Sequence, residues 1–142
     1  MRRLISFLVL AALLAPTVLA QQPGNVAKVG GIDVQPLEVT PISFAALSTT
    51  VQTVRGSAGG FESYQCYNPN SSVAYVQVFD ISSTVTLGTS TPKWSIGIAA
   101  TSSQGLSGLA MPFANAIKVA ATTTATGSTA PTTALVCNFG YW

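Results

Sequence analysis

The sequence predicts an all-β protein built as a single antiparallel β-sandwich, jelly-roll or immunoglobulin-like, with about seven strands. Three observations support this fold class. Short runs rich in Val, Thr, Ile and Tyr alternate between two faces. Turn-forming clusters of Gly, Pro, Asn and Ser separate these runs at intervals of about ten residues. After the first 20 residues, no segment combines a helical period with capping residues.

The first 20 residues have the layout of a secretory signal peptide. Met1–Arg3 is a positively charged start, an apolar run follows to Leu14, and Val18–Ala20 provides the small residues of a cleavage site. An uncleaved membrane anchor is the alternative, although this run is near the short limit for a spanning helix, about 20 residues. We therefore predict cleavage after Ala20, export to the periplasm or the medium, and no membrane segment afterwards.

The chain after residue 20 is almost uncharged and contains no histidine. Its charges balance, so no basic patch is available for nucleic acid or anionic lipid. A soluble monomer usually keeps its net charge away from zero, so neutrality favours a subunit packed into an assembly; a small domain kept soluble by Ser, Thr and Asn is the alternative. The charged residues are four acids (Asp33, Glu38, Glu62, Asp80) and four bases (Lys28, Arg55, Lys93, Lys118).

This composition predicts no enzyme, no cofactor and no metal site. Without histidine, a nucleophilic serine would need a lysine as its base, and Ser90 and Lys93 match the Ser-x-x-Lys spacing. Pro92 disfavours the helix that would bring them together, so we expect a loop. Asp80 is a lone carboxylate and a poor calcium ligand, so we expect it to cap the turn at residues 82–83.

Residues 21–45 are punctuated by Gly and Pro and predict an extended N-terminal arm, followed by the β domain at 46–142. Strands at 61–67 and 73–81, joined by a polar turn, predict a hairpin. Alternation places Phe61 with Gln65 and Tyr67, on the face opposite Tyr64. The 73–81 strand is largely apolar on both faces, which predicts a central strand or an interface. Further strands are expected at 93–98, 116–123 and 134–142.

Cys66 and Cys137 are the only cysteines. In an exported chain they predict one disulfide, which would fix the last strand to the strand ending near residue 67. Two buried free thiols are the alternative if the chain never meets an oxidising compartment. The loop of about 70 residues makes such a bond worth about 4 kcal/mol in the chain-entropy model.

Several blocks in the second half of the chain resemble a small β domain found in tailed phages, whose members are mostly uncharacterised or described as virion- or tail-associated. The resemblance covers about residues 55–142 and implies a structural role without catalytic residues. The leader and the two cysteines depart from it, which indicates an exported version of the domain and counts against a role in a virion. The blocks are Tyr67–Asn70, Ala74–Asp80, Leu87–Thr89 and Ile117–Thr124, followed by Thr126–Pro131.

Tyr67, Trp94 and Trp142 are candidates for a surface that stacks on sugar rings, because amphipathic aromatic side chains offer contact area with a polar end. Packing in the core or at a sheet edge is the favoured alternative for Trp94. Asn70 begins an N-glycosylation sequon, Asn-Ser-Ser, at the expected hairpin tip.

The first functional hypothesis is an exported, non-enzymatic structural subunit, virion-like or surface-associated, that self-associates or binds other such proteins. The second is a secreted carbohydrate- or receptor-binding module. A pilin-like subunit is the third, suggested by the penultimate Tyr141. It ranks lowest because pilins usually carry both cysteines early, and Thr129 stands where they have glycine.

Overall fold

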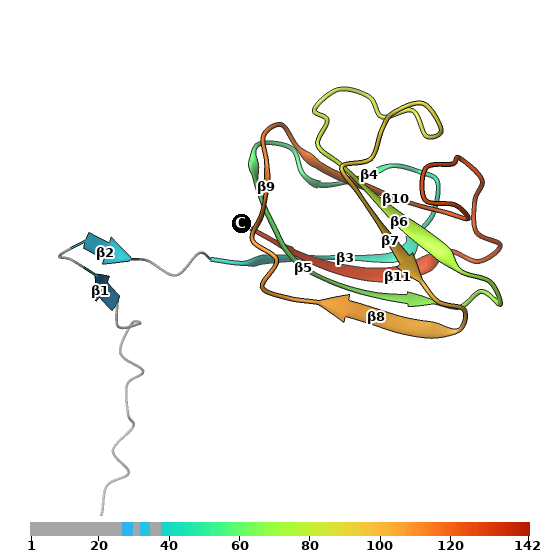
Figure 1. Cartoon of the computed structure of the whole chain (residues 1–142), viewed down its shortest axis with the longest axis horizontal. Helices are drawn as coiled ribbons and strands as arrows, with labels where there is room; N and C mark the ends of the chain where they lie inside the picture. Colours follow the sequence, from blue (N-terminus) through green and yellow to red (C-terminus); the bar gives the residue numbers. More distant parts are fainter. Residues whose placement is uncertain (1–26, 30–31, 35–37) are drawn as a thin grey trace, which may run out of the picture. The chain divides into compact units, whose positions relative to one another are not determined.

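The structure is a computed structural model that describes residues 27–29, 32–34 and 38–142. Residues 38–142 form two antiparallel sheets packed face to face, which confirms the predicted β-sandwich (Figure 1). The five-stranded sheet has the order β3 (Thr40–Leu47), β11 (Leu135–Tyr141), β5 (Gly59–Asn68) and β8 (Ser102–Leu106), with β9 (Met111–Phe113) also paired to β5. The four-stranded sheet has the order β4 (Gln52–Arg55), β10 (Ile117–Thr122), β6 (Ala74–Phe79) and β7 (Trp94–Ile98).

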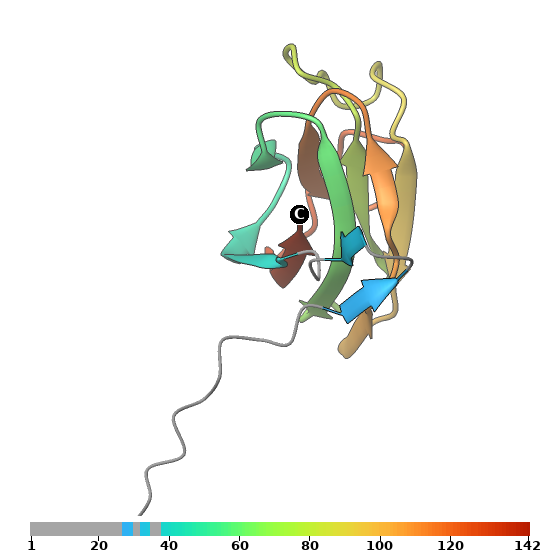
Figure 2. The ribbon, with the colours of Figure 1, turned by 90° about the vertical axis from the view of Figure 1, so that its left-hand side faces the viewer.

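Most connections cross from one sheet to the other. Figure 2 shows β3 and β4 along one side of the sandwich and β7 and β8 along the other. The predicted hairpin over residues 61–81 is therefore wrong, because β5 and β6 belong to different sheets. Both strands carry apolar inner faces. The turn between them leads from one sheet to the other, so these faces lie opposite each other across the core and the two backbones do not pair.

The core lies between the sheets and is built from alternate residues of the central strands. Leu135, Cys137 and Phe139 of β11 are buried. Phe61 is also buried, which corrects its predicted place on the face of Gln65 and Tyr67, because both of those residues are exposed. A register shift lies opposite Glu62, where Phe61 pairs with Tyr141 but Ser63 pairs with Gly140. One extra residue at such a bulge reverses the facing of everything before it.

The predicted disulfide is present between Cys66 and Cys137. The two residues are direct cross-strand partners on β5 and β11, with their Cα atoms 4.1 Å apart, and both are fully buried. The bond therefore ties the last strand to its neighbour within one sheet. It is compatible with an oxidising location, periplasmic or extracellular.

The sandwich begins earlier than residue 46, because β3 pairs along its length with β11. Within the predicted arm, β1 (Ala27–Val29) and β2 (Ile32–Val34) pair as a small antiparallel hairpin that belongs to a separate unit, residues 1–36. The predicted signal peptide, 1–20, lies outside the described residues. Among the described residues, we find no helix with the length and apolar character needed to cross a membrane.

Candidate functional site

The two outer faces of the sandwich differ. The outer face of the four-stranded sheet is covered by the connections at residues 80–93 and 123–134. Gln77 is fully buried there, and its side-chain amide donates to the Thr124 and Gly127 carbonyls at 3.2 and 2.9 Å. Phe79 beside it is also fully buried. The prediction that the 73–81 strand is central and buried on both faces is confirmed, and the chain itself provides the cover.

Among residues 38–142, no connection covers the outer face of the five-stranded sheet, and we call it the open face. Cross-strand pairing arranges its side chains in three rows over β3, β11, β5 and β8. No charged side chain occurs among them. The rows are Pro41–Gly140–Ser63, then Ser43–Asn138–Gln65–Gly105, then Val136–Tyr67–Ser103.

Large apolar side chains are exposed mainly on or beside this face. Tyr67 and Val136 form a cross-strand pair and are 44% and 45% exposed. Val39 and Leu106, also exposed, flank a shallow groove of about 580 Å³ over the middle of the face. Gly140 lies in its floor, where an added Cβ would stand 2.9 Å from Val39. Exposed apolar groups that gather on one uncharged face indicate an interaction surface.

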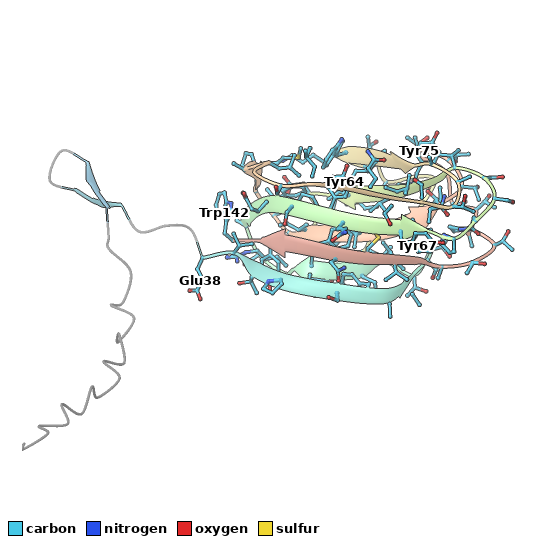
Figure 3. All side chains as sticks on the ribbon, turned by 90° about the horizontal axis from the view of Figure 1, so that it is seen from below. Glu38, Tyr64, Tyr67, Tyr75 and Trp142 are labelled. Atoms are coloured by element: carbon cyan, nitrogen blue, oxygen red, sulfur yellow. A yellow bond between two sulfur atoms is a disulfide. The ribbon has the colours of Figure 1, made fainter. Side chains whose placement is uncertain are left out.

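The charged side chains of residues 38–142 lie together at one end of the sandwich. Arg55 pairs with Ile117, where β10 begins, and Lys118 pairs with Phe79, where β6 ends. Glu62 follows Phe61, which pairs with Tyr141 at the end of β11. Glu38 is seen at that end beside Trp142 in Figure 3. The opposite end, which we call the tip, consists of residues 48–51, 69–73, 99–101 and 123–134 and contains no charged residue.

Most of these charges hold local structure. Asp80 is the clearest case, because its carboxylate accepts hydrogen bonds from Lys93 Nζ at 2.9 Å and from the main-chain nitrogens of Ala114 and Asn115 at 3.0 and 2.8 Å. Partial burial raises the pKa of Asp80, but these donors outweigh it and hold that pKa well below its usual range. The expected cap of the turn at 82–83 is instead made by Lys118, whose Nζ donates to both carbonyls.

The structure separates the three aromatic candidates. Tyr67 is exposed on the open face near the tip, whereas Trp142 lies at the other end of the sandwich (Figure 3). Trp94 packs edge-on against Phe61 and Tyr64 on the inner side, the favoured alternative. The Trp142 indole lies against Gly60, where an added Cβ would stand 2.0 Å from the ring. These residues do not form one stacking surface, and only Tyr67 remains a candidate contact.

Two further sequence candidates have structural roles. Ser90 Oγ accepts from the Thr86 main-chain nitrogen at 3.0 Å, and Lys93 pairs with Asp80, so each residue has a structural partner other than the other one. The side-chain amide of Asn70 donates to Asn68 Oδ1 and to the Thr133 carbonyl, both at 2.8 Å. Both of its hydrogens are used, so a glycan on this sequon would break a contact in the folded tip. Among the described residues, no three His, Cys, Asp or Glu side chains gather as a metal site would need.

Comparison of the chain with protein-family models, curated proteins and solved structures finds no match. The resemblance to tailed-phage domains and the absence of catalysis therefore stay predictions. Sequence reasoning missed the open face because, apart from Tyr67 and Val136, its residues are small or polar, and all are separated in the chain. The available signal was the alternation in the last strand, where Val136, Asn138 and Gly140 stand between the apolar residues Leu135, Cys137 and Phe139. This pattern separates the two faces of the strand, but it does not show which face other parts of the chain will cover.

Proposed function

We propose that this protein is an exported, non-enzymatic structural subunit that self-associates through the open face of its five-stranded sheet. The observation that carries the proposal is that this face is free of charged side chains while it gathers most of the exposed large apolar residues of the sandwich. The neutral charge balance, the predicted leader and the resemblance to virion-associated domains support an assembly role in a coat or other surface structure.

A second copy of the chain is the partner that fits this face best. In a two-fold dimer each residue meets the same surface of its partner, so a charged face would repel itself. The open face avoids that penalty. Its small residues, Ser43, Asn138 and Gly105 among them, leave a surface of low relief on which another sheet can pack at about 10 Å. Tyr67 and Val136 would supply the main apolar contact, at the end of the face next to the tip.

The edges of the same sheet offer a way to extend such an assembly. Exposed strand edges are usually protected by charged residues, prolines or bulges. β8 (Ser102–Leu106) has no charge and no proline, and Leu106 on it is 51% exposed. β3 has no charge either, although Pro41 and a bulge near its end give partial protection. Edge pairing between copies would join dimers into larger particles.

Light scattering coupled to size-exclusion chromatography tests the proposal. We expect the purified oxidised protein to form a defined oligomer, and Val136→Lys to weaken association at least tenfold because it buries an unpaired charge. Val73→Lys is the matched control, since Val73 is a valine of nearly equal exposure, 44%, at the tip and away from the open face.

Three results would contradict self-association through this face. The first is a wild-type protein that stays monomeric up to roughly 0.5 mM, a concentration at which even weak specific dimers form. The second is an oligomer that Val136→Lys leaves intact. The third is equal weakening by both lysine variants, which would show a general effect of added charge. Circular dichroism confirms that each variant is folded.

A further inference from the structure

The tip carries a second open depression, unrelated to the open face. This tip cleft has a volume of about 420 Å³ and lies between the β5–β6 turn and the connection from β10 to β11. That volume falls within the range of small-molecule sites, about 300–1,000 Å³. Its walls carry Ser71, Ser72 and Val73 on one side and Thr123, Pro131 and Thr132 on the other.

Hydrogen bonds between the two walls hold the cleft in a fixed shape. Asn70 and Thr133 pair reciprocally, with the Asn70 amide donating to the Thr133 carbonyl at 2.8 Å and accepting from the Thr133 main-chain nitrogen at 2.7 Å. Thr101 donates its main-chain N–H to the Asn70 carbonyl at 2.9 Å, which joins a third segment. A site that is already shaped loses little ordering entropy when a ligand binds.

The chemistry of the cleft is neutral and rich in hydroxyls. The bonds that join the walls use the main-chain groups of Thr133 and the side chain of Asn70, and the Ser72 carbonyl accepts from Asn68 within one wall. Within residues 38–142, the hydroxyls of Ser71, Ser72 and Thr132 make no hydrogen bond of their own. Each hydroxyl can both donate and accept, as a sugar hydroxyl does. The charged residues of the sandwich lie at the opposite end, so a charged ligand would find no partner here.

An exposed apolar residue completes the site. Val73 is the one exposed large apolar side chain of the sandwich that lies away from the open face and its rim. It lines the cleft together with the partly exposed Pro69, and the two give apolar surface for the C–H groups of a sugar ring, while Pro131 is buried in the opposite wall. We infer that the tip cleft binds a neutral carbohydrate. This inference is independent of the proposed self-association, because the cleft shares no residue with the open face.

Titration calorimetry on the purified protein tests the inference with a fixed set of hexasaccharides. The neutral probes are cellohexaose, maltohexaose, xylohexaose and mannohexaose, and hexagalacturonate is the acidic probe of the same length. We expect at least one neutral probe to bind with a Kd of about 1 mM or tighter, and hexagalacturonate to bind at least about tenfold more weakly.

Variants locate the binding site. Val73→Lys should weaken binding of that probe at least tenfold, because it places a charge and a long side chain in the cleft. Thr132→Val, which keeps the shape and removes one hydroxyl, should weaken it several-fold. Val136→Lys, on the open face, should leave the Kd unchanged within about twofold.

Each opposite result overturns the inference. These results are no binding of any neutral probe, equal or tighter binding of hexagalacturonate, full binding by Val73→Lys, or loss of binding in Val136→Lys. The last result would move the carbohydrate site to the open face. Self-association is measured separately by light scattering, so failure of one proposal leaves the other standing.

Discussion

Replacing Asn68 removes one buried side chain that joins the β5–β6 turn to the end of β7 at the tip. Its amide nitrogen lies 2.9, 3.0 and 3.1 Å from the carbonyls of Ser72, Ile98 and Ala99, and its oxygen accepts from the Asn70 main-chain nitrogen at 3.0 Å and from the Asn70 side-chain amide at 2.8 Å. Two amide hydrogens shared among three carbonyls, together with two accepted bonds, amount to about four full hydrogen bonds.

At about 1 kcal/mol for each hydrogen bond, Asn68→Ala should lower the free energy of unfolding by about 4 kcal/mol. For a domain of this size such a loss corresponds to a fall in Tm of roughly 15 °C. Asn138→Ala, at an exposed asparagine on the open face, is the control, and its effect should stay within about 0.5 kcal/mol. Urea unfolding followed by circular dichroism measures both variants.

Asn68→Asp gives a sharper test because it replaces the amide nitrogen, which the three carbonyls attract, by a carboxylate oxygen, which they repel. At neutral pH the new carboxylate would face three carbonyls without a hydrogen to donate, so its folded-state pKa would rise above the unfolded value near 3.9. A group with a raised pKa contributes most stability below its unfolded pKa and loses it as pH rises. The variant, relative to wild type, should therefore be more stable at pH 4 than at pH 7.

Two outcomes would refute this account of the tip. A loss of less than about 1 kcal/mol in Asn68→Ala would mean that the five contacts contribute little beyond what water supplies. A relative stability of Asn68→Asp that does not improve on acidification would mean that the side chain does not face the three carbonyls.

Three further predictions follow from the charged end and the sheet. Replacing both Cys66 and Cys137 by Ala should lower the free energy of unfolding by about 4 kcal/mol, because the disulfide closes a loop of 71 residues in the unfolded chain. Urea titrations measure this loss, and equal stability of the two proteins would contradict it. Asp80→Asn should cost roughly 1–3 kcal/mol at pH 7. Because the pKa of Asp80 is lowered, its carboxylate contributes fully to stability above about pH 4 and contributes less as the pH falls. The free energies of unfolding of wild type and variant should therefore converge in acid. A difference that stays constant with pH would show that the charge of the carboxylate does not cause it. Gly60→Ala should displace the Trp142 indole and cost about 1–3 kcal/mol, read from tryptophan fluorescence and melting; unchanged emission would show that the ring does not pack there.

The sequence predicted individual strands better than their partners. Alternation located the last strand and placed Leu135, Cys137 and Phe139 on one face of it, because burial on one face leaves a period of two. It placed Phe61 on the wrong face, since nothing in the residues announced the bulge at Glu62. It also joined β5 and β6 in one sheet, because a short polar turn is common to hairpins and to crossings between sheets.

The candidate sites were harder to predict than the strands. The aromatic residues were chosen one by one for their chemistry, and their separation in space depends on the sheet order, which no local pattern encodes. The asymmetry between the covered and open faces depends on where residues 80–93 and 123–134 fold back. The gathering of charges at one end required knowing that the end of β6 and the starts of β7 and β10 lie together.

The disulfide between neighbouring strands also determines how the sandwich responds to mechanical tension. A pulling force applied at residues 38 and 142 would pass directly from Cys66 to Cys137 and bypass the chain between them. That bypassed ring spans 71 residues and contains β6 to β10, together with the cover of the four-stranded sheet and both walls of the tip cleft. At about 3.4 Å per residue, it withholds roughly 240 Å of extension. Under a pulling force, only the segments outside the ring can unfold and extend. The maximum extension of a subunit in an assembly under tension would therefore be limited to the length of these segments.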